Sequence, residues 1–295
     1  LPALGLATVG CVAAFFGAAQ LLTNQFLDPI AILPLVGGLL TIIGLVVYQY
    51  RARNPLLTIR EMLTSSIPIA GIIVALFAAA ASVSATALTA TVLSEEYSPL
   101  HVGLLYLPEA GGAVITAIAL GMLLDRVYIH YLPLVGMMFL AAGIAVFLIQ
   151  VPAGQGQALT ASFLTGIGLG ATVAPALFVA GFSLRALNLQ RVFAIVELFR
   201  AVAAFMVAPI FFHFAETVSD DLATGVTIAL WIGLGLSLGG AVLAVATYIL
   251  SGARPQTPDI EGFIAGRKSA WYSPPLLARL RRIAIPGRAV TEGAD

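Results

Sequence analysis

An apolar stretch from Gly103 to Arg126 constrains the fold more than any other part of the sequence. A helix of about 20 apolar residues crosses the hydrocarbon core of a bilayer, and this stretch is long enough to do so. Glu109 lies near one end of it, and the pair Asp125 and Arg126 closes the other. The chain of 295 residues is 60% hydrophobic and 9% charged, whereas soluble domains are about 25% charged. These values indicate a polytopic membrane protein.

Further stretches of the same kind divide the chain into about eight predicted spans. Only helices and closed barrels satisfy the backbone inside lipid, and the residue-by-residue alternation of a barrel is missing here. The sequence therefore predicts an all-α polytopic bundle of about eight transmembrane helices. The predicted spans are residues 2–23, 29–50, 66–93, 102–124, 131–150, 157–184, 192–214 and 224–250.

Charged residues alternate between the two sides of the predicted bundle. One set of connections carries the basic residues Arg51, Arg53, Arg60, Arg126, Arg185 and Arg191, and the tail after residue 250 carries more. The other set carries Asp28, Glu95, Glu96, Glu216, Asp220 and Asp221, without Lys or Arg. Basic connections stay in the cytoplasm. Both termini of the chain are therefore expected to be cytoplasmic, which agrees with an even number of spans.

The two ends of the sequence carry separate expectations. The chain begins with Leu1 and enters its first apolar run at once, so the simplest interpretation is that its natural N-terminal portion is absent. In the polar tail, apolar residues recur at helical spacing over residues 276–284. This pattern suits an amphipathic helix on an anionic cytoplasmic leaflet, and a disordered basic tail is the open alternative.

Three short motifs resemble one family of transporters. The run GMLLDR from Gly121 to Arg126 resembles the G-x-L-x-D-R motif of the major facilitator superfamily. The stretch from Ala194 to Ala204, with Arg200, resembles the segment that opens the penultimate helix of fourteen-span drug:proton antiporters of the EmrB/QacA type, although alanines replace its Gln and two Gly. The run RARNPLL at residues 51–57 resembles the linker into the second half of those proteins.

The resemblance implies an organisation and a function. Residues 1–50 would be two extra transmembrane helices, residues 51–250 the C-terminal six-helix bundle, and residues 251–295 a cytoplasmic tail. The N-terminal six helices would be a missing partner. The implied protein is a secondary active transporter of a bacterial inner membrane, which exports small amphiphilic or drug-like compounds in exchange for protons by alternating access. Its partners would be the bilayer, the substrate, protons and the missing half.

Charged residues inside the spans are the candidates for this chemistry. Glu197 and Arg200 are three residues apart, so they share a helix face and can pair. Glu197 could exchange a proton while Arg200 tunes it, Arg200 could receive an anionic substrate group, or the two could form a structural ion pair. Glu109 could exchange protons near neutral pH, or simply stay hydrated in a vestibule. Gly121, Asp125 and Arg126 are expected to form a cytoplasmic gate hinge.

Other functions find less support in the sequence. An uptake permease, or an organic-anion transporter that uses Arg200, remains open, as does a non-transporting membrane sensor or scaffold. An enzyme is not expected, because no nucleophile–base pair and no H-E-x-x-H motif occurs. The three histidines lack the spacing of metal ligands, and Cys11 is the single cysteine. No cofactor, metal or nucleic-acid partner is expected.

Overall fold

A computed structural model describes residues 2–52, 55, 57–276 and 278 of the chain, and these residues form helices without any strand. The helices are α1 (Pro2–Gln20), α2 (Pro29–Arg51), α3 (Ile59–Thr64), α4 (Ser66–Glu96), α5 (Pro99–Leu105), α6 (Leu107–Leu123), α7 (Leu132–Phe147), α8 (Gln155–Phe182), α9 (Leu189–Val218), α10 (Leu222–Ser251) and α11 (Ile260–Ile264). Two 3₁₀ turns, η1 (Val127–His130) and η2 (Ala186–Asn188), lie in connections.

Within the described part of the chain, seven helical segments are long and apolar enough to cross a membrane. They are α1, α2, α4, α5 with α6, α8, α9 and α10. The predicted all-α polytopic bundle is therefore confirmed. The remaining predicted span is the apolar helix α7, which has 16 residues and is about 24 Å long. It is shorter than the hydrocarbon core of about 30 Å, so its ends must extend into the connections if it spans.

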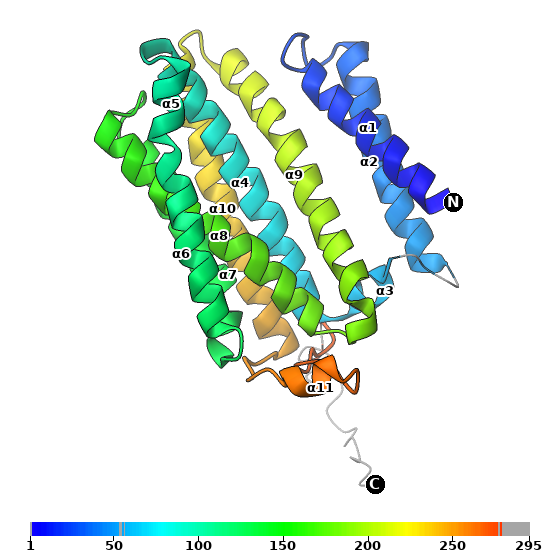
Figure 1. Cartoon of the computed structure of the whole chain (residues 1–295). Helices are drawn as coiled ribbons and strands as arrows, with labels where there is room; N and C mark the ends of the chain where they lie inside the picture. The colour runs from blue at the N-terminus through cyan, green and yellow to red at the C-terminus, as the bar shows by residue number, and fades with distance from the viewer. Residues whose placement is uncertain (1, 53–54, 56, 277, 279–295) are drawn as a thin grey trace.

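Helix α4 lies at the centre of the bundle, where it packs against α7, α8, α9 and α10 (Figure 1). Its central run of alanines from Ala78 to Ala81 is buried, which lets these neighbours approach closely. The α1–α2 hairpin lies beside α9 (Figure 1) and contacts it through α1, where Ala14, Ala18 and Met206 share one small core.

Glycines set the distance between two pairs of helices. A Cβ added to Gly166 of α8 would overlap the backbone oxygen of Glu109 in α6, so only glycine allows this approach. A Cβ added to Gly38 of α2 would likewise overlap the backbone of Ala14 in α1. Small residues at such points allow membrane helices to pack backbone against backbone.

The span expected at residues 102–124 is divided into two helices at Tyr106, which ends α5 and caps α6. Pro108 lies in the first turn of α6, where the missing N–H costs nothing. The Tyr106 hydroxyl also lies 2.5 Å from Oγ1 of Thr89 in α4, which ties the break to the central helix. The tertiary contact explains why hydropathy alone predicts one uninterrupted span.

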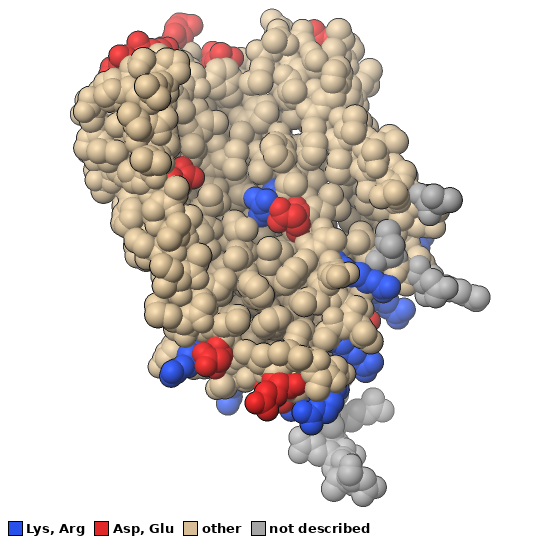
Figure 2. Space-filling view, in the orientation of Figure 1, with Lys and Arg blue, Asp and Glu red and all other residues tan. Residues whose placement is uncertain are grey.

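The two ends of the bundle differ in charge (Figure 2). One end, which we call the acidic end, carries the acidic residues of the connections and of the last turns of α4 and α9: Asp28, Glu95, Glu96, Glu216, Asp220 and Asp221. Asp28 and Asp221 accept hydrogen bonds from the first turns of α2 and α10, so part of this acidity caps helices. Arg51, Arg60, Arg126, Arg185, Arg254 and Lys268 lie at the other end, the basic end.

After α10 the chain turns at Gly252, whose φ of 71° is left-handed, and crosses the basic end with α11 (Figure 1). The amphipathic helix expected over residues 276–284 lies outside the described residues, apart from Leu276 and Ala278.

Candidate functional site

Glu197 and Arg200 form an ion pair on α9. Nε of Arg200 donates to Oε2 of Glu197 at 2.8 Å, and a terminal nitrogen of Arg200 donates to Oε1 of the same carboxylate. Arg200 follows Leu189, the first residue of α9, by 11 residues, which is about 16 Å along the helix axis. Glu197, eight residues after Leu189, lies about 12 Å along the axis, so the pair is inside the span rather than at its end.

Both side chains of the ion pair are partly exposed on the surface of the bundle. The side chain of Glu197 is 47% exposed and that of Arg200 is 27% exposed. Neighbouring α9 residues Val196 and Ala203 are buried in the bundle, so the pair lies beside the stripe that packs inward. Figure 2 shows a blue and a red group in contact at mid-height, surrounded by tan atoms. Charges at this depth are costly in lipid, so this surface needs water or a protein cover.

Glu109 lies in the first turn of α6, at the same height as the break at Tyr106. Its backbone packs on Gly166, while its side chain is half-buried and has no hydrogen bond or ion pair to another described residue. The N-terminus of a helix stabilises a negative charge, which gives this carboxylate a structural role even without a ligand.

The structure does not join Glu109 to the pair on α9. Helices α6 and α9 both pack on α8. Within the described part of the chain, no hydrogen bond or ion pair connects Glu109 with Glu197 or Arg200. They are two separate candidate positions for a charge-coupled step.

The motif from Gly121 to Arg126 lies at the basic end of α6. Arg126 Nε lies 3.8 Å from the Asp125 carboxylate, and both side chains are largely exposed. Among the described residues this is the only ion pair that either of them forms. A Cβ added to Gly121 would meet no atom within 4 Å, so packing in this conformation does not require glycine there.

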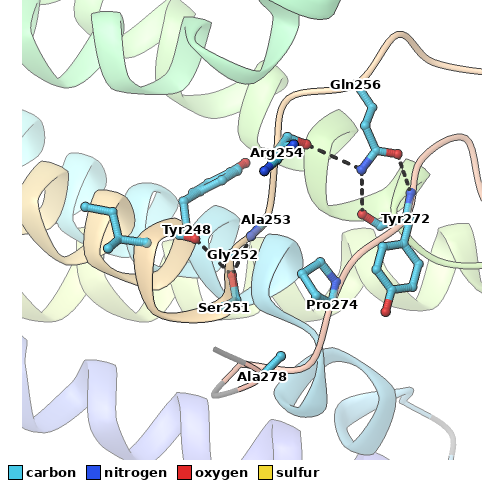
Figure 3. Close-up of a pocket in the computed structure, with 10 residues that line it drawn as sticks. Tyr248, Ser251, Gly252, Ala253, Arg254, Gln256, Tyr272, Pro274 and Ala278 are labelled. Atoms are coloured by element: carbon cyan, nitrogen blue, oxygen red, sulfur yellow. Dashed lines mark hydrogen bonds between the residues drawn. The ribbon is translucent and has the colours of Figure 1, made fainter. Parts of the chain in front are cut away.

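Two hollows of the described surface lie at the basic end. One pocket of about 690 Å³ lies between the end of α10 and the tail, where Arg254, Gln256 and Tyr272 line it (Figure 3). A second, of about 590 Å³, lies where the Asn188 amide donates to Glu61 at 2.8 Å. Neither hollow contains Glu109, Glu197 or Arg200, and the described residues hold no cluster of three metal-ligating side chains.

Residues in the tail after α10 make contacts that the sequence does not predict. Phe263 and Trp271 are buried, at 4% and 3% exposure, against the ends of spanning helices. The signal that could have indicated this docking is two large aromatic residues in an otherwise polar, proline-punctuated segment.

Comparison with known proteins identifies no family and no function for this arrangement of residues. The sequence matches no protein-family model, and it matches no curated protein.

Proposed function

We propose that this chain is part of a secondary active transporter of the major facilitator type, which exports small amphiphilic compounds in exchange for protons. The bundle of apolar helices is compatible with a membrane transporter. The three motifs at residues 51–57, 121–126 and 194–204 support the family assignment because they occur in its order. The charge distribution favours an orientation with the basic end in the cytoplasm. The family resemblance implies a bacterial inner membrane.

One observation carries the proposal: the ion pair of Glu197 and Arg200 is partly exposed, and its two residues lie about 12 Å and 16 Å from the start of α9. A half-exposed carboxylate at this depth is unfavourable against acyl chains. It becomes favourable where a polar pathway runs along α9. We therefore place this face of α9 on the translocation pathway, opposite the second six-helix half that the family resemblance implies.

In the proposed mechanism, Glu197 changes its protonation state during transport. When the carboxylate is charged, Arg200 holds it with two hydrogen bonds. Protonation removes the charge that Arg200 binds, so the guanidinium is released and the face of α9 changes its charge. Glu109 is the second candidate for this role, and Gly121, Asp125 and Arg126 act at the cytoplasmic gate.

The pairing favours proton coupling over the anion-transport alternative. Two donors of the Arg200 guanidinium already point to Glu197. An anionic substrate would have to displace that carboxylate before Arg200 could receive it, which makes anion binding the weaker candidate.

The test is transport by the full-length protein in proteoliposomes with an imposed pH gradient, using ethidium as the amphiphilic cation. We expect Glu197→Gln to abolish gradient-driven ethidium transport and to retain ethidium exchange without a gradient. Glu96→Gln is the matched control, because Glu96 is exposed at the acidic end. Unchanged coupling in Glu197→Gln would remove this residue from the mechanism. Absence of any ethidium movement by the parent protein would contradict drug export and favour a sensor or scaffold.

A further inference from the structure

Residues 254–276, which we call the C-terminal strap, fold back across the basic end of the bundle. Figure 1 shows α11 and its flanking chain lying beneath the ends of the spanning helices. The strap contacts three places that are distant in the sequence: the start of α4, the end of α8 and the turn η1 between α6 and α7.

At the start of α4, the strap satisfies backbone donors that the helix leaves free. The N–H of Ser66 donates to the carbonyl of Pro274 at 3.0 Å, and the N–H of Ile67 donates to Oγ of Ser273 at 3.1 Å. The first N–H groups of a helix have no partner within it, and both of these residues are buried. The strap therefore performs the role of an N-cap for the central helix.

At the end of α8, the strap donates a hydrogen bond to a backbone carbonyl of the helix. The N–H of Ala270 donates to the carbonyl of Phe182, the last residue of α8, at 2.9 Å. A single segment thus supplies hydrogen bonds to one end each of α4 and α8, two helices that also pack directly together.

Aromatic packing adds the third contact. The Phe182 ring lies 4.8 Å from Phe263 and 5.9 Å from Trp271, measured between ring centroids. The ring centroids of Trp271 and of His130 in η1 are 4.6 Å apart, in a T-shaped arrangement. The turn η1 joins α6 to α7. The strap therefore links the basic ends of four helices: α4, α6, α7 and α8.

The strap is braced internally. Nζ of Lys268 lies 2.8 Å from the Asp259 carboxylate, whose pKa is lowered mainly by this hydrogen bond and further by the N–H of Gly262. Gln256 makes reciprocal hydrogen bonds with the backbone of Tyr272 (Figure 3). These contacts connect residues of the strap to one another, independently of its contacts with the bundle.

The docked strap also buries polar atoms without partners. Nε1 of Trp271 and both ring nitrogens of His130 are buried and have no hydrogen-bond partner in the described structure. Such groups would regain water if the strap moved away. The aromatic contacts thus hold the strap in place, while the unpaired nitrogens favour its release.

We propose that the C-terminal strap is a latch that holds the basic ends of α4, α8 and η1 together when docked and lets them separate when Trp271 and Phe263 leave their sites. The latch is a property of this chain alone and does not depend on what the protein transports.

The test measures the distance between the ends that the latch holds. Spin labels at Leu63→Cys on α3, next to the start of α4, and at Leu187→Cys on η2, next to the end of α8, occupy exposed positions. The background is the full chain with Cys11→Ser in lipid nanodiscs. We expect one distance population in this parent, and a second, longer population when Trp271→Ala is added. Tyr272→Ala is the matched control, because Tyr272 is 66% exposed, and it should keep the parental distribution.

A milder variant keeps the test readable if Trp271→Ala does not fold. Ser273→Ala removes only the acceptor for the Ile67 N–H, and it should add the longer population to a smaller extent. Unchanged distances in Ser273→Ala and in any folded Trp271→Ala protein, while the strap becomes sensitive to protease, would overturn the proposal. An equal shift in Tyr272→Ala would overturn it as well, because the effect would not depend on the buried ring.

Discussion

Arg200 donates two hydrogen bonds to Glu197 on the preceding turn of α9, and the pair lies partly exposed inside the span. The two side chains together carry no net charge, so the helix can tolerate them at a depth where either charge alone would be unfavourable. Spacing by three residues on one helix predicts that such a pair can form, and the structure forms it.

Removing the charge of one residue of this pair should therefore lower the stability of the protein more than removing both charges. We expect Arg200→Gln to lower the free energy of unfolding more than the double variant Arg200→Gln/Glu197→Gln, with a coupling of about 1 kcal/mol. The physical reason is the uncompensated carboxylate that the single variant leaves in the span. The measurement is unfolding of the purified protein in mixed micelles by increasing SDS, followed by helix content. Strictly additive single and double effects would show that the two side chains are independent.

The contact between Gly166 and the Glu109 backbone predicts a large effect from one methyl group. We expect Gly166→Ala to lower the free energy of unfolding by about 3 kcal/mol, the upper part of the range for overpacked positions, because the new Cβ would overlap a backbone oxygen. Gly111→Ala on α6 is the control, since a Cβ there meets nothing within 4 Å. The same SDS titration compares them, and equal stability of the two variants would contradict this packing.

The spans were predictable because membrane insertion depends on local composition. The segments expected at residues 29–50 and 224–250 correspond to α2 (Pro29–Arg51) and α10 (Leu222–Ser251), since apolar runs bounded by charges leave little choice of boundary. The ion pair on α9 followed from spacing within one helix. Its role in transport and the gate role of the Gly121 motif stay predictions.

Tertiary contacts account for what the sequence did not predict. The helix break at Tyr106 depends partly on Thr89, which lies 17 residues earlier on another helix. The docking of Trp271 depends on His130 and Phe182, which come from distant parts of the chain. Hydropathy treats each segment alone, so it assigns the tail to the polar surface and cannot find these partners.

The distribution of charge predicts the orientation of the bundle. In a Cys11→Ser background, we expect a membrane-impermeant maleimide to label Leu27→Cys in intact cells and to label Leu187→Cys only after the membrane is permeabilised. Both side chains are exposed, Leu27 at the acidic end and Leu187 at the basic end. The reason is the retention of basic connections in the cytoplasm. The reverse pattern of labelling would invert the assignment of the gate.

His130 makes the stability of the protein depend on pH, because its imidazole binds a proton at a different pH in the folded and the unfolded chain. Burial lowers the pKa of its imidazole from 6.5 to about 4, and the Gln256 backbone, which approaches it without hydrogen-bond geometry, offsets only part of this effect. Above pH 6.5 the ring is neutral in both states, so its titration does not change the free energy of unfolding. Between pH 6.5 and 4 the unfolded chain binds a proton that the folded chain does not, and stability falls as the pH falls.

Replacement of the ring isolates this contribution. We expect the free energy of unfolding of the parent to fall by about 2 kcal/mol more than that of His130→Phe between pH 7.5 and pH 5, because phenylalanine keeps an aromatic ring beside Trp271 and binds no proton. Carboxylates elsewhere titrate equally in both proteins, so their effect cancels in the comparison. The measurement is the SDS titration repeated at each pH. Parallel pH dependences would mean that His130 already reaches water in the folded protein, which contradicts its burial beneath the strap.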